Sequence, residues 1–115
     1  MRRDSRDLEL AFATKELREL CIHASHAKER LGLKAASNLR DRLADLSAAQ
    51  NASDIFVLPG QPTVVTINDG RIGIAAKLAE GVHLVYVPNH ASRKLLANGD
   101  TDWSRVRRIK ILRID

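Results

Sequence analysis

Apolar positions at the start of the chain change from the spacing of a strand to that of a helix. Residues 8–12 alternate apolar with polar or small side chains, which predicts a short strand with one buried face. Thr14 is suited to cap a helix, and Leu17, Leu20 and Cys21 then fall on one helical stripe. This spacing predicts that Cys21 is a small core residue.

Two further helical patterns follow. We expect Ser25 to cap the first, which ends at Leu31 before Gly32. The strongest amphipathic signal in the chain covers residues 33–49. We expect its polar side, including Asn38–Asp45, to be solvated helix surface and not a site. Its apolar positions share one face and are Ala35 or Ala36, Leu39, Leu43 and Leu46.

The apolar period changes to two after the connector Asp54–Pro62. Strands are predicted over 63–67, 72–78, 82–87 and 106–114, with turns at 68–70 and 80–81. The segment 89–102 is predicted to be a loop with a helical turn at Ser92–Ala97. This order predicts an α+β fold of the form β-α-α-β-β-β(-β). We expect one domain over residues 1–115, with a mainly antiparallel sheet and the N-terminal helices packed on one face.

The net positive charge lies in the C-terminal part of the chain. Residues 1–70 contain ten Lys or Arg and ten Asp or Glu, whereas residues 71–115 contain nine and four. This asymmetry fits either a solvated basic surface or a polyanionic partner. The sequence shows no apolar leader, no membrane-length apolar run and a single cysteine, which predicts a cytoplasmic protein that does not contact membranes.

Motifs of the common enzyme classes are absent from the sequence. No phosphate-binding glycine loop, zinc-ligand spacing or nucleophile elbow is present. His23 and His26 are three residues apart, but no carboxylate joins them at ligand spacing, so a surface or capping role is expected. We therefore expect neither a metal nor a cofactor.

Basic residues alternate with the apolar positions of the later strands. Tyr86 falls on the apolar side and is expected in the core. The opposite side is either a solvated surface or an anion-binding face, and a set of basic groups without a carboxylate among them favours the second. The residues predicted on that side are Arg71, Lys77, His83, Arg108 and Lys110.

These residue types suit RNA cleavage without a metal. Such a reaction needs proton transfer and cations that stabilise the charge on the phosphoryl group. Imidazole transfers protons near neutral pH, and arginine binds phosphate through two parallel hydrogen bonds. We assign catalysis to His83, Arg108 and Lys110, and RNA or phosphate binding to Arg71, Lys77, Arg107 and Arg113.

Several segments resemble HigB-like toxins of the RelE/ParE superfamily. Leu8–Leu20 is similar to their opening strand and helix, and Leu58–Gly60 to their connector. Gly81–Pro88 is similar to a later strand of the family. Asp102–Val106 followed by Arg108–Leu112 is similar to its closing strand. The resemblance covers nearly the whole chain in order and implies a small α+β fold with two N-terminal helices.

The resemblance implies the toxin half of a bacterial toxin–antitoxin pair. The first activity that the resemblance implies for this toxin is that of a ribosome-dependent mRNA endonuclease, or mRNA interferase, which inhibits translation. The implied partners are mRNA on the ribosome and a cognate antitoxin of helix-turn-helix type, through which a hetero-oligomer binds operator DNA. Two alternatives stay open, because Gln61–Val65 lacks the histidine that relatives often carry there and His83 replaces an arginine. These are a ParE-like toxin that inhibits DNA gyrase by binding, and a degenerate member that binds only its antitoxin.

Overall fold

Local sequence signals account for the helices in the computed structural model, which describes residues 8–91 and 93–115. The side chain of Thr14 accepts a hydrogen bond from the Leu17 backbone N–H and begins α1 (Lys15–Ile22). His23 has an extended backbone and separates α1 from α2 (Ala24–Leu31). Gly32, with a φ of +87°, separates α2 from α3 (Leu33–Ala48). Ser25 was predicted to cap α2, and this was wrong because the N-cap is His23 and the helix begins at Ala24.

The strands of the described chain are β1 (Glu9–Phe12), β2 (Thr63–Thr66), β3 (Ile72–Ala79), β4 (Val82–Pro88) and β5 (Arg108–Ile114). They form one sheet in the order β1-β5-β4-β3-β2. β1 runs parallel to β5, and the other neighbours pair antiparallel. The first strand therefore joins the sheet beside the last, and helices precede the remaining strands. The predicted α+β layout is confirmed.

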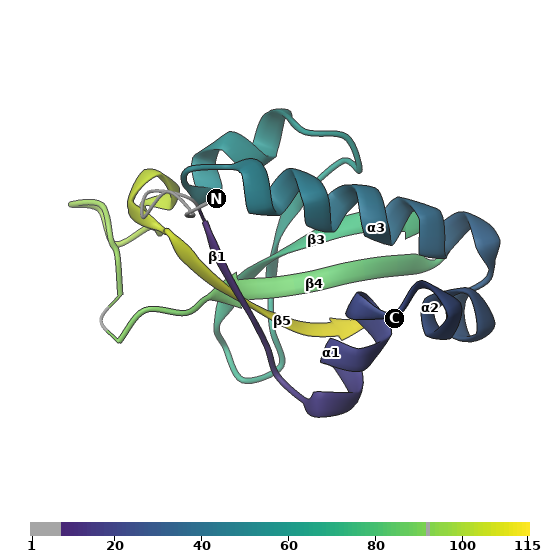
Figure 1. Ribbon diagram of the computed structural model, residues 1–115. Helices are drawn as coiled ribbons and strands as arrows, with labels where there is room; N and C mark the ends of the chain where they lie inside the picture. The colour runs from purple at the N-terminus through teal and green to yellow at the C-terminus, as the bar shows by residue number, and fades with distance from the viewer. Residues whose placement is uncertain (1–7, 92) are drawn as a thin grey trace, which may run out of the picture.

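The helices cover one side of the sheet. Figure 1 shows α3 lying along the sheet beside β3, while α1 packs against β1 and β5. Leu39 of α3 is 1% exposed and belongs to the main core, as the amphipathic pattern predicted. The sheet contributes its apolar positions to the same core, namely Ile74, Leu78, Leu84, Tyr86, Ile109 and Ile111.

The polar side of α3 is less solvated than predicted. The side-chain amide of Asn38 donates to the backbone carbonyl of Leu78 at 2.7 Å and so ties the helix to β3. Arg42 and Asp45 form an ion pair at 3.2 Å, and the Arg42 side chain is only 15% exposed. The connector explains this burial, because Gly60 lies against the Arg42 side chain and accepts a hydrogen bond from the Lys77 N–H. The prediction of a solvated surface was wrong for these residues.

The connecting segments contain short helical turns that the sequence reading missed. The first, η1 (Ala52–Val57), falls at the start of the predicted connector, and the second, η2 (Trp103–Arg105), precedes β5. Because η2 occupies these positions, β5 begins at Arg108, two residues later than predicted. Of the helical turn predicted at Ser92–Ala97, Ser92 lies outside the described residues and the remainder is not helical.

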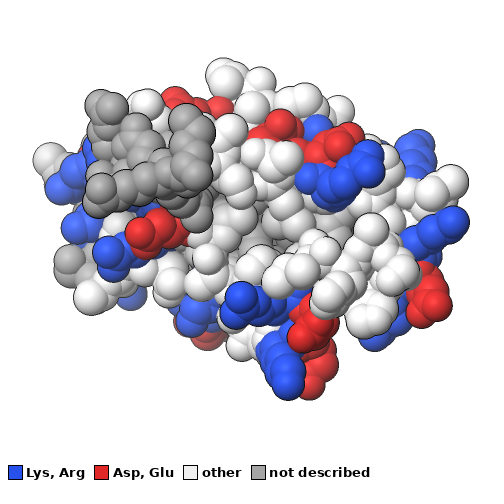
Figure 2. All heavy atoms as spheres, viewed as in Figure 1, with Lys and Arg blue, Asp and Glu red and all other residues white. Residues whose placement is uncertain are grey.

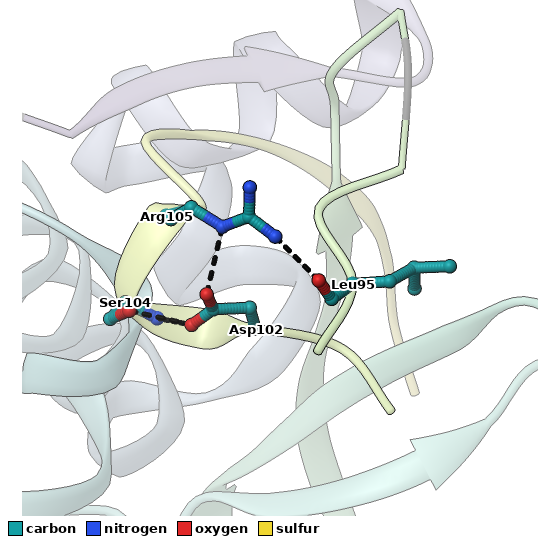
Figure 3. A network of polar contacts seen from close by, with 4 residues as sticks. All are labelled: Leu95, Asp102, Ser104 and Arg105. Atoms are coloured by element: carbon teal, nitrogen blue, oxygen red, sulfur yellow. Dashed lines mark hydrogen bonds and ion pairs between the residues drawn. The ribbon is translucent and has the colours of Figure 1, made fainter. Parts of the chain in front are cut away.

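Polar contacts around Asp102 hold η2 against the preceding loop (Figure 3). Asp102 accepts hydrogen bonds from the backbone and hydroxyl of Ser104 and from the Arg105 guanidinium. The same guanidinium donates to the backbone carbonyl of Leu95. Hydrogen bonds from Ser104, then from Arg105, lower the pKa of the Asp102 carboxyl. The start of the Asp102–Val106 segment therefore has a local structural role.

The side of the sheet away from the helices carries a second, smaller apolar cluster. Its buried members are Ile67, Val85 and Val87, and no residue of α1, α2 or α3 belongs to it. Gly73 of β3 lies beneath this cluster, and a Cβ there would approach the Tyr86 carbonyl oxygen to 2.7 Å. We call this side the uncovered face.

Among the described residues, no helix is long and apolar enough to cross a bilayer.

Candidate functional site

The register of the sheet brings Arg71, Arg108 and Lys110 to one end of the uncovered face. The Asn89 backbone N–H donates to the Arg108 carbonyl at 2.7 Å, so these two residues are level. The register between β3 and β4 pairs Ile74 with Tyr86, and continued by three residues it places Arg71, just before β3, level with Asn89 from the other side. Arg71 and Arg108 are therefore two strand spacings apart, about 10 Å. Lys110 follows two residues along β5 on the same side, and we call this set the Arg108 end.

Three other predicted residues gather at the opposite end. Lys77 of β3 is paired directly with His83 of β4. Arg113 is paired with Val85, two residues along β4 from His83 on the same side. Asp115 exchanges both backbone hydrogen bonds with His83, at 2.7 and 3.0 Å. We call Lys77, His83 and Arg113 the His83 end.

The two ends are too far apart to act on one phosphate. Lys110 is paired with Val87, which lies four residues along β4 from His83. Four residues of strand span about 13 Å. A proton-transfer group must lie within hydrogen-bond reach of the atom it serves. The predicted catalytic set is therefore divided, with His83 apart from Arg108 and Lys110.

Carboxylates accompany most of the predicted cations, contrary to expectation. Arg71 Nε lies 2.7 Å from Asp69, Lys77 Nζ lies 3.0 Å from Glu80, and both acids come from turns. Hydrogen bonds from Arg71, its backbone N–H first, lower the pKa of Asp69, and one from Lys77 lowers that of Glu80. Two further pairs join Arg108 to Glu9 at 3.0 Å and Arg113 to Asp115 at 2.7 Å. The prediction of a carboxylate-free face was wrong, because these acids lie in turns, on a neighbouring strand and beside the end of β5.

Lys110 differs from these paired cations. Its strand neighbours are Ala11 of β1 and Val87 of β4, neither of which carries a charge. It makes no ion pair with any residue that the structure describes, and its side chain is half-buried. Arg107, also predicted to bind RNA, is exposed just before β5 and likewise has no ion pair within the described chain. The Arg108 end therefore offers positive charge that no carboxylate of the described residues neutralises.

His90 is a member of this end that the sequence reading missed. Its Nε2 accepts hydrogen bonds from the backbone N–H groups of Arg107 at 2.9 Å and Arg108 at 3.3 Å. Burial, then the charges of Lys94 and Arg108, lower the pKa of His90, and Glu9 opposes this shift. No local motif marks His90, because its neighbours come from β1 and from the start of β5.

The hydrogen bonds of His90 restrict its chemistry. A neutral imidazole that accepts at Nε2 carries its proton on Nδ1 and can donate only from there. The nitrogen that would act as a base is already occupied by two backbone groups. His90 is therefore suited to be a neutral hydrogen-bond donor toward an anion, and not to remove a proton.

Acidification is expected to destabilise the fold through His90. Because the pKa of His90 is lowered on folding, the unfolded chain binds a proton first as the pH falls below the ordinary value of 6.5. The free energy of unfolding should therefore decrease below about pH 6.5 and be fully retained above it. Chemical denaturation across this range should show a smaller decrease for His90→Gln, whose side-chain oxygen still accepts a hydrogen bond. Identical pH profiles for the two proteins would contradict the assignment.

Candidate residues on the helical side have structural roles. Tyr86 is 1% exposed in the main core, as predicted, and burial raises the pKa of its hydroxyl. Burial also raises the pKa of the Cys21 thiol to about 11, which leaves it protonated and unreactive near neutral pH. His23 lies at the N-terminal boundary of α2 and contacts Glu19 at 2.9 Å, and its ring meets that of His26 edge-on. The described residues contain no group of three or more side chains arranged to hold a metal.

The visible surface on the helical side is mixed in charge. Figure 2 shows Lys and Arg next to Asp and Glu at several places around this side, with uncharged residues between them.

No family model, curated protein or solved structure matches this chain. The assignment of function therefore depends on the geometry of the uncovered face and on the sequence resemblance.

Proposed function

We propose that this chain is a RelE/HigB-like toxin whose uncovered sheet face binds the phosphate backbone of RNA. The observation that carries the proposal is the convergence of Arg71, Arg108 and Lys110 at one end of that face. Arg108 and Lys110 come from β5 and Arg71 from the residue just before β3, far apart in the sequence, and Lys110 has no ion pair among the described residues. The structure has the α+β class that the resemblance implies, with three α-helices before β2, and this agreement in class supports the same conclusion.

The leading activity is metal-independent cleavage of mRNA on the ribosome. Lys110 and Arg108 stabilise the additional negative charge that develops on a phosphoryl group under attack. His90, held neutral, donates a hydrogen bond to a phosphate oxygen. The 2′-hydroxyl attacks the phosphorus and the bond to the 5′-oxygen breaks, while water or a group of the ribosome takes the 2′-hydroxyl proton and protonates the departing 5′-oxygen. The ribosome also orients the phosphodiester for this attack. His83 then contacts a neighbouring nucleotide and does not share the phosphate bound by Lys110.

The separation of the two ends favours a second candidate of another class. With His83 about 13 Å from Lys110 along the strand, and His90 unable to act as a base, no histidine of the described residues is placed to remove a proton beside the unpaired cation, and the Glu9 carboxylate there is held by Arg108. Such a face binds a polyanion or an acidic protein without cleaving it. A ParE-like toxin that inhibits DNA gyrase by binding would use it in this way.

Expression of the chain alone distinguishes these candidates. We expect induction to arrest growth and co-expression of the antitoxin from the adjacent gene to restore it. Primer extension on a translated transcript should then reveal new 5′ ends that disappear when translation is blocked. Intact mRNA with reduced plasmid supercoiling would instead identify gyrase as the target. Normal growth with a stable antitoxin complex would leave only the binding role.

A further inference from the structure

Arg108, the more exposed of the two arginines at the Arg108 end, forms an ion pair with a residue of the neighbouring strand. Glu9 of β1 is the direct partner of Arg108 in the parallel pairing, so both side chains project from the same side of the sheet. The Glu9 Oε2 to Arg108 Nε distance is 3.0 Å. The two side chains are 58% and 59% exposed, and pairs with this exposure contribute little to stability because water screens them. The contact can therefore be broken at small cost.

Other groups that suit an anion lie beside this pair. His90 accepts from the Arg108 backbone N–H at 3.3 Å, and Glu9 is the strand partner of Arg108, so the three residues lie together. Burial, and then the charge of Lys94, four residues along the chain from His90, contribute to lowering the pKa of His90. The backbone carbonyl of Lys94 accepts a hydrogen bond from the Asp102 N–H at 2.7 Å, which anchors the residue beside η2. The Lys94 ammonium makes no ion pair with the described residues. The Glu9–Arg108 pair thus lies beside the His90 ring, whose Nδ1–H is not used in the backbone hydrogen bonds of Nε2.

We infer that a phosphate group binds at Arg108 by displacing Glu9, with Lys94 and His90 as its other contacts. A guanidinium donates hydrogen bonds to a carboxylate and to a phosphate in the same way, so Glu9 occupies the position that the phosphate takes. A phosphate in this position interacts with both cations. Once displaced, the Glu9 carboxylate stays tethered nearby and repels the bound anion. Glu9 therefore lowers the affinity of the Arg108 end for phosphate.

This inference deepens the proposed RNA binding and rests on it for the identity of the ligand. The test compares Glu9→Gln with the wild-type protein, using a labelled single-stranded oligouridylate as one probe and inorganic phosphate as another. The substitution removes the competing charge and keeps the size of the side chain. We expect oligouridylate to bind about two- to fivefold more tightly, the range given by removing one exposed charge interaction. The NMR signal of the Arg108 Nε–H should also shift at lower phosphate concentration.

Glu80→Gln is the matched control. It releases Lys77 from an ion pair of the same 3.0 Å length at the His83 end and changes the net charge by the same amount. An increase in affinity that comes only from net charge would therefore appear equally in both variants, and that result would overturn the inference. A larger increase for Glu9→Gln supports it.

The two probes separate this inference from the proposed function. If oligouridylate binds to neither protein while phosphate shifts the Arg108 signal more readily in Glu9→Gln, the anion site stands and RNA binding fails. If oligouridylate binds equally to the wild-type and Glu9→Gln proteins, RNA binding stands and the role of Glu9 fails. If neither probe has any effect, both fail.

Discussion

Alanine in place of Lys110 should remove the growth arrest that the proposed function implies, while leaving the protein folded. Lys110 is the half-buried cation of the uncovered face without an ion pair in the described structure, so its charge is available to a phosphate. Loss of one preorganised charge at a phosphoryl transition state costs about 100-fold or more in rate. Growth after induction and the rate of mRNA cleavage should both report this loss. Arg108→Ala should have a similar effect, because it removes the arginine with two-point phosphate geometry.

Arg40→Ala provides the control for this experiment. Arg40 lies on α3, on the helical side of the sheet, and its side chain is 76% exposed beside Asp41. The substitution removes the same unit of charge, so toxicity should remain if position on the uncovered face is what matters. Circular dichroism and thermal unfolding establish that each variant is folded. Full toxicity of folded Lys110→Ala and Arg108→Ala proteins would move the functional surface elsewhere.

Leu39→Ala is expected to be among the most destabilising single substitutions in the helical layer. Leu39 is 1% exposed on the face of α3 that packs against the sheet, and truncation leaves a cavity that rigid neighbours cannot fill. Buried Leu→Ala changes cost about 2–5 kcal/mol of unfolding free energy. Urea denaturation followed by far-ultraviolet circular dichroism measures this loss as a lower midpoint with an unchanged slope.

Leu33→Ala on the same helix tests whether burial is the cause. Leu33 is 69% exposed, so the same chemical change should alter the unfolding free energy by no more than about 0.5 kcal/mol. Equal losses at the two positions would mean that helix propensity, and not packing, sets the stability of α3. The comparison therefore separates local from tertiary contributions to this helix.

Short-range patterns predicted most of the helices and strands. Thr14 begins α1 because its side chain can accept from a backbone N–H three residues later, within the same local segment. The apolar stripe that includes Leu39 placed one face of α3 in the core. The alternation around Tyr86 likewise placed its ring on the core side of β4. Each of these features depends on residues a few positions apart, which the sequence displays directly.

The composition of the candidate site depended on pairings between distant segments. Glu9 neutralises Arg108 because the first strand lies parallel to the last, and residues so far apart in sequence meet only through the sheet order. His90 joins the same end through backbone hydrogen bonds across a loop. His83 was grouped with Lys110 because strand alternation predicts the side on which a residue lies. Alternation carries no information about position along a neighbouring strand.

The sequence by itself therefore determined the α+β class, the helical stripes and the basic residues of one sheet face. These follow from the repeat of 3.6 residues in a helix and of two in a strand, which are properties of the local backbone. The tertiary structure alone decided which of these basic residues meet, which are neutralised by a carboxylate, and that His90 belongs with them. The reason is physical: ion pairs and hydrogen bonds act over a few ångströms of space, and strand order and register bring segments within that range.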